Sequence, residues 1–237
     1  MALLTFLGTT STLGTRAWAG SGISLSTSVF VTSESMQVID QGQQIKFFGH
    51  VKATHARDIL WSDELISDKT KQQLHAIGHV SLYKDNDSNV VWEGFGDEGT
   101  YDTLKNFIVL WTRDTRKKAL LIRHPKDQPK TITLHLEANR LETDSDLSFA
   151  HAHGDSYGID ISTSSQQSLR FWAEDATYHQ AQSSFLLQGG KPVLIIEQPS
   201  ETRRVTGQTI EYLIDEEKLV TRGQAVAQIF PKGKRAP

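Results

Sequence analysis

Hydrophobic and polar residues alternate along most of the chain from Val29 onward, in short runs separated by turn-forming residues. A spacing of two between apolar residues is the period of a β-strand with one buried face. The first runs with this spacing are Val29 and Val31, Met36 and Val38, Ile45 and Phe47, and Val51 and Ala53. Turn-type residues interrupt the runs at 41–42, 84–87 and 189–192. No long stretch keeps the spacing of an amphipathic helix, so the pattern predicts an almost all-β chain.

A longer pattern repeats along the chain. The segments IKFFGHV (45–51) and LHAIGHV (74–80) both end in Gly-His-Val, and each closes a unit that opens with acidic residues and two alternating apolar positions. Comparable units begin near Glu34, Asp63, Glu98, Glu137, Glu174 and Thr209. Their period of roughly 29–45 residues is typical of solenoid-like arrays. One unit cannot bury its apolar face alone, so we expect stacked units that share an interior.

Five of the six units carry a glycine at their end. Glycine tolerates positive φ, so it lets a strand kink or bulge at a corner. The corner candidates are Gly49, Gly78, Gly154, Gly189 and Gly223. His50 and His79 directly follow two of these glycines, which argues for a shared backbone geometry and against catalysis.

Composition excludes several classes of function. The chain has 237 residues, 38% hydrophobic and 22% charged, with a formal net charge of -3. No overall basic field indicates a nucleic acid partner. The absence of cysteine excludes disulfides and thiolate metal sites. No run approaches the ~20 apolar residues of a membrane-spanning helix.

The N-terminus indicates export. A short apolar run is followed by Ala17-Trp18-Ala19, the small-x-small pattern that signal peptidase reads. The expected domains are therefore a signal peptide over 1–19 cleaved near Ala19, a β domain over 20–230, and a basic disordered tail over 231–237. A disordered start to a cytosolic protein is the alternative.

The ordered units resemble the OstA-like family of lipopolysaccharide-transport proteins, most closely its soluble periplasmic bridge members. The segments that carry the resemblance are VFVTSESMQVIDQGQQIKFFGHVKAT, DELISD with LHAIGHVSLY, GTYDTLKNFIVL, and GQTIEYLIDEEKLVTRGQAV. Together they span about 29–230. Between Trp111 and Thr206 the chain has more sequence than a minimal bridge protein, equivalent to one or two extra units.

The resemblance implies a fold and a role. The fold is an open, twisted β-jelly-roll, a solenoid-like stack of antiparallel strands with an apolar interior groove. The role is non-enzymatic transport of lipopolysaccharide through the periplasm, with the acyl chains of lipid A in the groove. The implied partners are an inner-membrane extractor subunit at the N-terminal edge, an outer-membrane translocon at the C-terminal edge, and further copies joined head to tail. The edge strands would lie within 26–32 and 220–229.

Strand alternation and the resemblance together select candidate lipid-binding residues. They are Val29, Val31, Met36, Val38, Ile45, Phe47, Val51, Val80, Leu82, Tyr101, Phe107 and Val109. In a closed sandwich the same residues would be ordinary core.

Other chemistry is weakly indicated. His151 and His153 are two apart and would point the same way on a strand, but no further metal ligands at matched spacing are legible. Acidic pairs such as Asp63-Glu64 and Glu174-Asp175 suit solvated edges better than glycoside hydrolysis. We therefore expect no metal, no cofactor and no enzyme activity.

Three questions stay open at this level. The basic run 113–130 fits either a solvated hairpin loop or a contact surface for lipid phosphates. A membrane-anchored subunit of the same transport system would retain residues 1–19. A carbohydrate-active or adhesive β-solenoid would use Trp61, Trp92, Trp111 and Trp172 as aromatic platforms on one exposed face, and a purely structural protein would polymerise without lipid.

Overall fold

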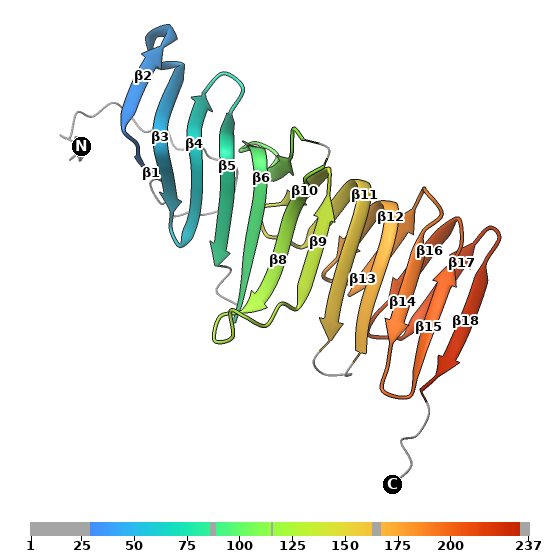
Figure 1. Cartoon of the computed structure of the whole chain (residues 1–237). Coiled ribbons are helices and arrows are strands. Elements are labelled where there is room, and N and C mark those ends of the chain that lie inside the picture. The colour runs from blue at the N-terminus through green and yellow to red at the C-terminus, as the bar shows by residue number, and fades with distance from the viewer. Residues whose placement is uncertain (1–28, 86–88, 115, 163–166, 233–237) are drawn as a thin grey trace.

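The computed structural model describes residues 29–85, 89–114, 116–162 and 167–232. The expected signal peptide and residues 233–237 of the expected tail lie outside these ranges. The described chain is almost entirely strand, so the all-β prediction is confirmed. Figure 1 shows an elongated stack with β1 and β2 at one end and β18 at the other.

The elements follow the predicted runs. The strands are β1 (Val29–Thr32), β2 (Ser35–Ile39), β3 (Gln44–His55), β4 (Asp58–Asp68), β5 (Gln73–Asp85), β6 (Val90–Asp102), β7 (Phe107–Trp111), β8 (Ala119–Pro125), β9 (Leu134–Ala138), β10 (Arg140–Asp144), β11 (Phe149–Ser162), β12 (Gln167–His179), β13 (Ser184–Gln188), β14 (Val193–Glu197), β15 (Glu201–Thr206), β16 (Thr209–Leu213), β17 (Lys218–Arg222) and β18 (Val226–Pro231). A 3₁₀ turn, η1 (Asp40–Gly42), joins β2 to β3. Within the described ranges the structure has no helix with the length and hydrophobicity needed to cross a membrane.

The strands form two layers, and six long strands bend once and run through both of them, namely β3, β4, β5, β6, β11 and β12. Layer 1 contains, in order, β2, 44–48 of β3, 64–68 of β4, 73–77 of β5, 98–102 of β6, β7, β10, 149–153 of β11, 175–179 of β12, β13, β16 and β17. Layer 2 contains β1, 51–55 of β3, 58–62 of β4, 80–85 of β5, 90–96 of β6, β8, β9, 156–162 of β11, 167–173 of β12, β14, β15 and β18. Spatial order thus follows chain order in both layers. In such a meander each unit contacts only the units next to it in the chain, which is the stacked arrangement that the repeat pattern predicted.

The bend between the layers is built from glycine packed against a polar side chain. Gly49 and Gly78 have φ of +77° and +76°, and the pairing register shifts beside both of them. A Cβ on Gly78 would lie 2.2 Å from Asp63 Oδ2, so the acidic side chain of the preceding strand occupies the space. All five predicted corner glycines have positive φ, which confirms the corner prediction.

The histidines after these glycines share the corner geometry. His50 and His79 also have positive φ, 43° and 44°. Their Nδ1 atoms lie 2.7 Å from Glu34 Oε1 and from Asp63 Oδ2, respectively. Both imidazoles are almost fully solvent-exposed. Their equivalence is therefore one of backbone geometry, as expected.

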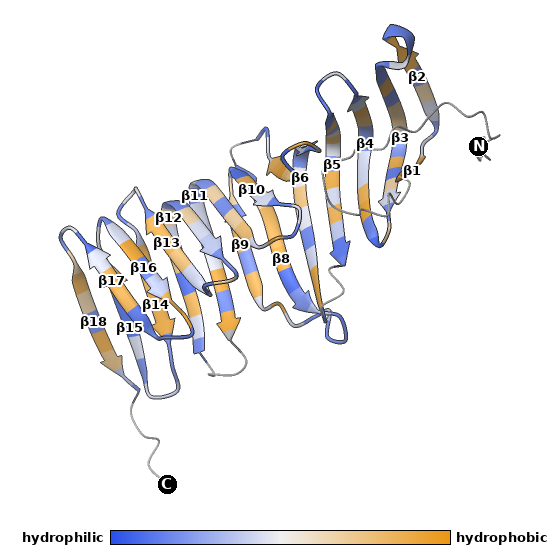
Figure 2. Cartoon of the chain, turned by 180° about the vertical axis from the view of Figure 1, so that it is seen from behind, coloured by the Kyte–Doolittle hydropathy of each residue, from blue (hydrophilic) through white to orange (hydrophobic). Residues whose placement is uncertain are grey.

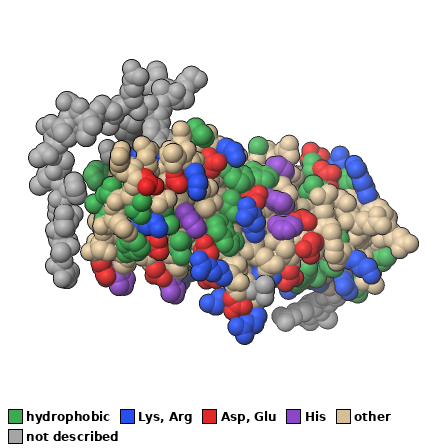
Figure 3. All heavy atoms as spheres, turned by 90° about the horizontal axis from the view of Figure 1, so that it is seen from above, with side chains coloured by type: hydrophobic (Ala, Val, Ile, Leu, Met, Phe, Trp, Pro, Cys, Tyr) green, Lys and Arg blue, Asp and Glu red, His purple; other side chains and the backbone are tan. Residues whose placement is uncertain are grey.

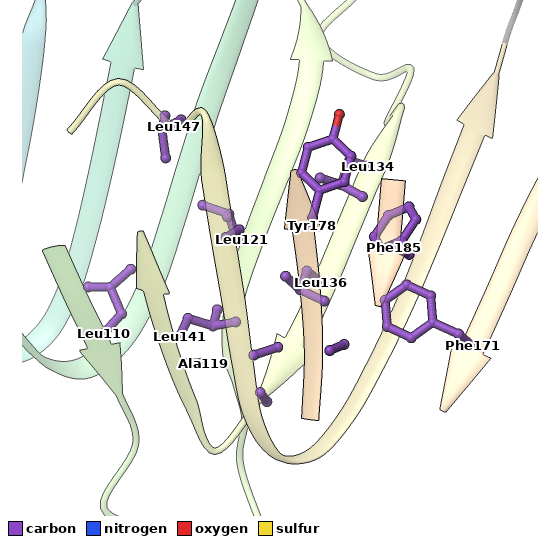
Figure 4. Close-up of a cluster of buried hydrophobic side chains, with 14 of the residues drawn as sticks. Leu110, Ala119, Leu121, Leu134, Leu136, Leu141, Leu147, Phe171, Tyr178 and Phe185 are labelled. Carbon is purple, nitrogen blue, oxygen red and sulfur yellow. The ribbon is translucent and has the colours of Figure 1, made fainter. Parts of the chain in front are cut away.

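The core lies between the layers. Figure 4 shows Leu110, Leu136 and Leu141 with Phe171 and Phe185 in the space between facing strands. Phe171 is 0% and Phe185 is 1% exposed, and their ring centroids are 5.0 Å apart. Full burial of such a side chain contributes about 1.5–3 kcal/mol. Figure 2 shows the corresponding alternation of hydrophobic and hydrophilic residues along the strands.

Two boundaries differ from the sequence expectations. The last strand continues through Pro231, and the backbone N–H of Lys232 bonds to the carbonyl of Ser200, so the ordered sheet extends into the expected tail. The basic run 113–130 is also not one loop, because β8 occupies its centre. The sequence reasoning missed the alternating apolar strand ALLIRH, because basic residues surround it.

Candidate functional site

The inward-facing surface differs between the two halves of the stack. In the N-terminal half, Phe47, Leu60, Leu74 and Ile108 pack against the core but keep part of their surface exposed. We call the inward-facing side chains of β1 to β8 the N-terminal interior surface. From β9 to β14 the inward apolar side chains are buried, and Leu134, Leu187 and Leu194 are 0% exposed.

Ten of the twelve predicted lipid-binding residues lie on the N-terminal interior surface. Cross-strand partners share a face of the sheet, and the register connects Met36 through Phe47 to the core residue Leu65. In layer 2, Val31 lies opposite the core residue Ala53. The ten are Val29, Val31, Met36, Val38, Ile45, Phe47, Val51, Val80, Leu82 and Tyr101. They range from Val51, 1% exposed, to Val38, 55% exposed at the end of the stack.

Phe107 and Val109 lie on the opposite, outer face of layer 1. Val109 pairs with Thr100 and Glu142, whereas Ile108 and Leu110 alternate with it and face the core. The apolar run FIVLW has no polar residue to fix which alternate set points inward. Ile108 and Leu110 are therefore interior residues that sequence reasoning missed, together with Leu60 and Leu121.

Tyr101 combines an interior ring with a polar end. Its hydroxyl donates a 2.7 Å hydrogen bond to Asn106 Oδ1 in the β6–β7 turn. Burial raises the pKa of Tyr101, so the phenol stays neutral. The ring is half-buried beside Leu74, its partner in the register.

One inward-facing row of layer 2, well away from the corner, carries charges. Lys84, Trp92 and Arg123 are neighbours in the register, one on each of β5, β6 and β8. Lys84 Nζ lies 2.6 Å from Asp58 Oδ2, and both side chains are mostly buried. The N-terminal interior surface is thus apolar near the corner and polar along this row.

Arg123 is the most extensively bonded member of that row. It donates from Nε to Thr133 Oγ1 at 3.1 Å and from Nη1 to the Tyr178 hydroxyl at 3.0 Å, although Tyr178 belongs to the other layer. Its Nη2 lies 3.5 Å from Asp160 Oδ2. Its guanidinium also stacks over Trp92, 5.7 Å from the ring centroid.

Burial dominates the electrostatics of this group. Asp160 is 4% exposed, and desolvation raises its pKa to about 6 in spite of the nearby guanidinium. Burial also raises the pKa of Tyr178. The sequence indicated Arg123 only as part of the basic run 113–130, and no pattern brought it together with Asp160 and Tyr178, because they lie on different strands and meet only through the register.

The outer face of layer 1 holds most of the histidine contacts. His75 stacks on Trp111 and lies 2.8 Å from Glu98 Oε2, while Arg113 also bonds Glu98. The Arg113 hydrogen bond, ahead of that from His75, holds the pKa of Glu98 below its usual value. In Figure 3, histidine side chains lie beside acidic and basic ones along the molecule.

His151 and His153 do point the same way, and both contact Asp175. Within the described ranges, however, no three His, Asp or Glu side chains are arranged to hold a metal ion. A hollow of about 240 Å³ on the same outer face is lined by Leu186, Gln188, Thr209, Glu211, Val220 and Arg222.

The basic run is largely neutralised by neighbours. Besides the Arg113–Glu98 pair, Arg116 bonds Asp114, and Lys118 Nζ lies 2.7 Å from Asp155 Oδ2. The four tryptophans proposed as platforms do not share a face either. Trp92 is 3% exposed in the interior, Trp172 is 41% exposed on the outer face of layer 2, and Trp111 lies on the outer face of layer 1.

Both ends of the stack present strand edges. In the pairings of the described residues, β1 and β2 pair only with β3, β17 only with β16, and β18 only with β15. Apolar side chains are exposed at both ends, including Phe30 at 69% and Ile229 at 60%. Such edges have free backbone N–H and C=O groups that another strand can pair with.

Part of the chain matches a protein-family model. Residues 30–119 match the family model described as "LptA/(LptD N-terminal domain) LPS transport protein". The resemblance to lipopolysaccharide-transport proteins is therefore confirmed for this segment. The family-matched segment begins in β1 and ends at the first residue of β8, so it carries almost all of the N-terminal interior surface.

Residues beyond 119, including the C-terminal unit quoted from the sequence, lie outside the match. Several solved structures are similar, among them LptH of Pseudomonas aeruginosa, described as the LptA-homologous periplasmic component of the lipopolysaccharide transport device. That chain is 16% identical, with a TM-score of 0.45, and the similarity covers 54% of this chain and 82% of LptH. None of the curated proteins matches the chain.

Proposed function

We propose that this protein binds lipopolysaccharide by its acyl chains and carries it through the periplasm between the inner and outer membranes. The observation that carries the proposal is the coincidence of the family-matched segment with the N-terminal interior surface. Binding needs no bond chemistry, so the protein acts as a carrier and not as an enzyme.

The energetics favour an apolar interior for this cargo. Each acyl CH₂ that leaves water contributes about 0.8 kcal/mol. Successive partners in the layer 2 register form an apolar row across β1, β3, β4 and β5, and they are Val31, Ala53, Leu60 and Leu82. An acyl chain along this row would replace contact with water by contact with side chains on successive strands.

The open edges support a bridging arrangement. Strand addition at an exposed edge joins two proteins through backbone hydrogen bonds. In this proposal β1 and β2 receive the inner-membrane extractor subunit, β17 and β18 receive the outer-membrane translocon, and copies of the chain join head to tail between them. The apolar side chains exposed at both ends, such as Phe30 and Ile229, would be covered in these contacts.

Leu60→Glu and Ile59→Glu form a matched pair that tests lipid binding. Both residues are half-buried on β4, but Leu60 faces the interior and Ile59 faces outward. Loss of about two CH₂ contacts near the new carboxylate costs about 1.6 kcal/mol, so Leu60→Glu should weaken lipopolysaccharide binding roughly tenfold. Ile59→Glu should leave the Kd unchanged.

The Kd is measured on purified protein, and melting curves of both variants establish that each is folded. Equal Kd values for folded Leu60→Glu and Ile59→Glu, or no binding by the parent protein, would contradict the proposal.

A further inference from the structure

The interior is less completely filled on the N-terminal side of the boundary between β8 and β9. There Phe47, Leu60 and Ile108 are half-buried, among buried residues such as Val80 at 2% and Leu121 at 3% exposure. On the C-terminal side, Leu136 is 1%, Phe171 is 0% and Phe185 is 1% exposed. An acyl chain on the N-terminal interior surface therefore meets a filled core beyond β8.

A polar cluster stands at this boundary. We call Arg123, Asp160, Tyr178 and Trp92 the Arg123 closure. Its members come from β8, β11, β12 and β6, and the Arg123–Tyr178 hydrogen bond of 3.0 Å joins layer 2 to layer 1. The Arg123 and Asp160 side chains are only 19% and 6% exposed.

The closure lies where the charged row of layer 2 enters the filled core. Arg123 and Asp160 flank Leu134 in the register, with Lys84 and Trp92 on the N-terminal side and the buried Leu169 and Ile196 on the C-terminal side. Burial of an ion pair costs several kcal/mol of desolvation per ion, and hydrophobic replacements are often as stable. Core stability alone therefore does not explain why charged residues occupy these positions. A contact that holds the two layers together at this place does explain them.

We propose that the Arg123 closure ends the acyl-binding surface in the middle of the chain, so that lipid reaches the interior beyond β8 only when the Arg123–Tyr178 contact between the layers opens. This inference rests on the proposed function. The resting protein holds acyl chains against β1 to β8, and the C-terminal half admits them in a minor, open state.

The test places a photo-reactive phenylalanine analogue at Phe47 or at Phe185, in the full chain with purified lipopolysaccharide. Both are phenylalanines that face the interior, one on each side of the closure. An open state populated at 10% or less gives at least about tenfold fewer adducts at Phe185 than at Phe47. Arg123→Met and the milder Tyr178→Phe should each raise the Phe185 adducts severalfold and leave those at Phe47 unchanged.

Arg170→Met is the matched control. Arg170 also lies in layer 2 and pairs with Glu197, but it faces outward, so its replacement should leave both yields unchanged. Phe185 adducts equal to those at Phe47 in the parent, or yields that neither closure variant alters, would overturn the closure. Absence of adducts at Phe47 in every protein would instead overturn the proposed function.

Discussion

Comparison of Gly78→Ala with Gly42→Ala separates two costs at the corner, that of side-chain packing and that of a positive φ. Gly78 and Gly42 both have positive φ, +76° and +86°. A residue with a Cβ pays about 1–2 kcal/mol in this region. Gly42→Ala pays only that cost, because nothing lies within 4 Å of the added Cβ.

Gly78→Ala must also move Asp63. The new Cβ would lie 2.2 Å from Asp63 Oδ2 and 2.9 Å from Asp63 Cβ, so that side chain has to leave its rotamer and its contact with His79. An off-rotamer side chain costs about 0.5–1.5 kcal/mol. Loss of the solvent-exposed contact with His79 adds about 0–1 kcal/mol. We expect Gly78→Ala to be about 1–2 kcal/mol less stable than Gly42→Ala.

Urea unfolding of the purified variants measures this difference. In a chain of this length it corresponds to a melting temperature lower by roughly 2–8 °C. In an Asp63→Ala background the excess should shrink, because contacting residues couple and the clashing carboxylate is gone, while the 2.9 Å approach to the Cβ of residue 63 remains. Equal costs for the two glycine variants, or an excess that is undiminished in the Asp63→Ala background, would refute the packing account of the corner.

Three further predictions concern the buried carboxylate, the core and the edges. The folded pKa of Asp160 is raised to about 6, so its proton is bound more tightly in the folded state and stability is lost as pH rises from 4 through 6. Relative to the parent, the free energy of unfolding of Asp160→Asn should therefore rise by up to about 3 kcal/mol as the pH goes from 4 to 7. Parallel curves of unfolding free energy against pH for the two proteins would exclude this linkage. Phe171→Ala should lower the free energy of unfolding in urea by about 3–5 kcal/mol, whereas Val38→Ala at the exposed end should lower it by less than about 1 kcal/mol. Similar losses for the two variants would mean that the interior is not filled at Phe171. Ile229→Lys should reduce self-association in sedimentation at an unchanged melting temperature, since the residue is 60% exposed, and unaltered association would remove β18 from the proposed head-to-tail contact.

The sequence predicted the fold through two local signals. Period-two alternation located the strands, and the glycine at the end of a unit located the bends at Gly49 and Gly78. Both signals are local because strand faces and backbone turns depend on neighbouring residues. Alternation also assigned ten of the twelve candidate residues to the interior.

The remaining features depend on contacts between distant strands. FIVLW is apolar at every position, so only pairing with Thr100 and Glu142 shows that Val109 faces outward. Similarly, Arg123 and Tyr178 are 55 residues apart and meet through the bend of two layers. A basic run in sequence gave no indication that one of its arginines is an interior residue.

Photo-crosslinking at neighbouring inward and outward positions tests most directly whether acyl chains bind in the interior. Val31 and Phe30 are consecutive on β1, and Tyr101 and Phe107 lie on the adjacent strands β6 and β7, with one member of each pair on either face. We predict lipopolysaccharide adducts at Val31 and Tyr101 and background levels at Phe30 and Phe107. Equal adducts on both faces, or adducts at Phe30 and Phe107 alone, would contradict the account.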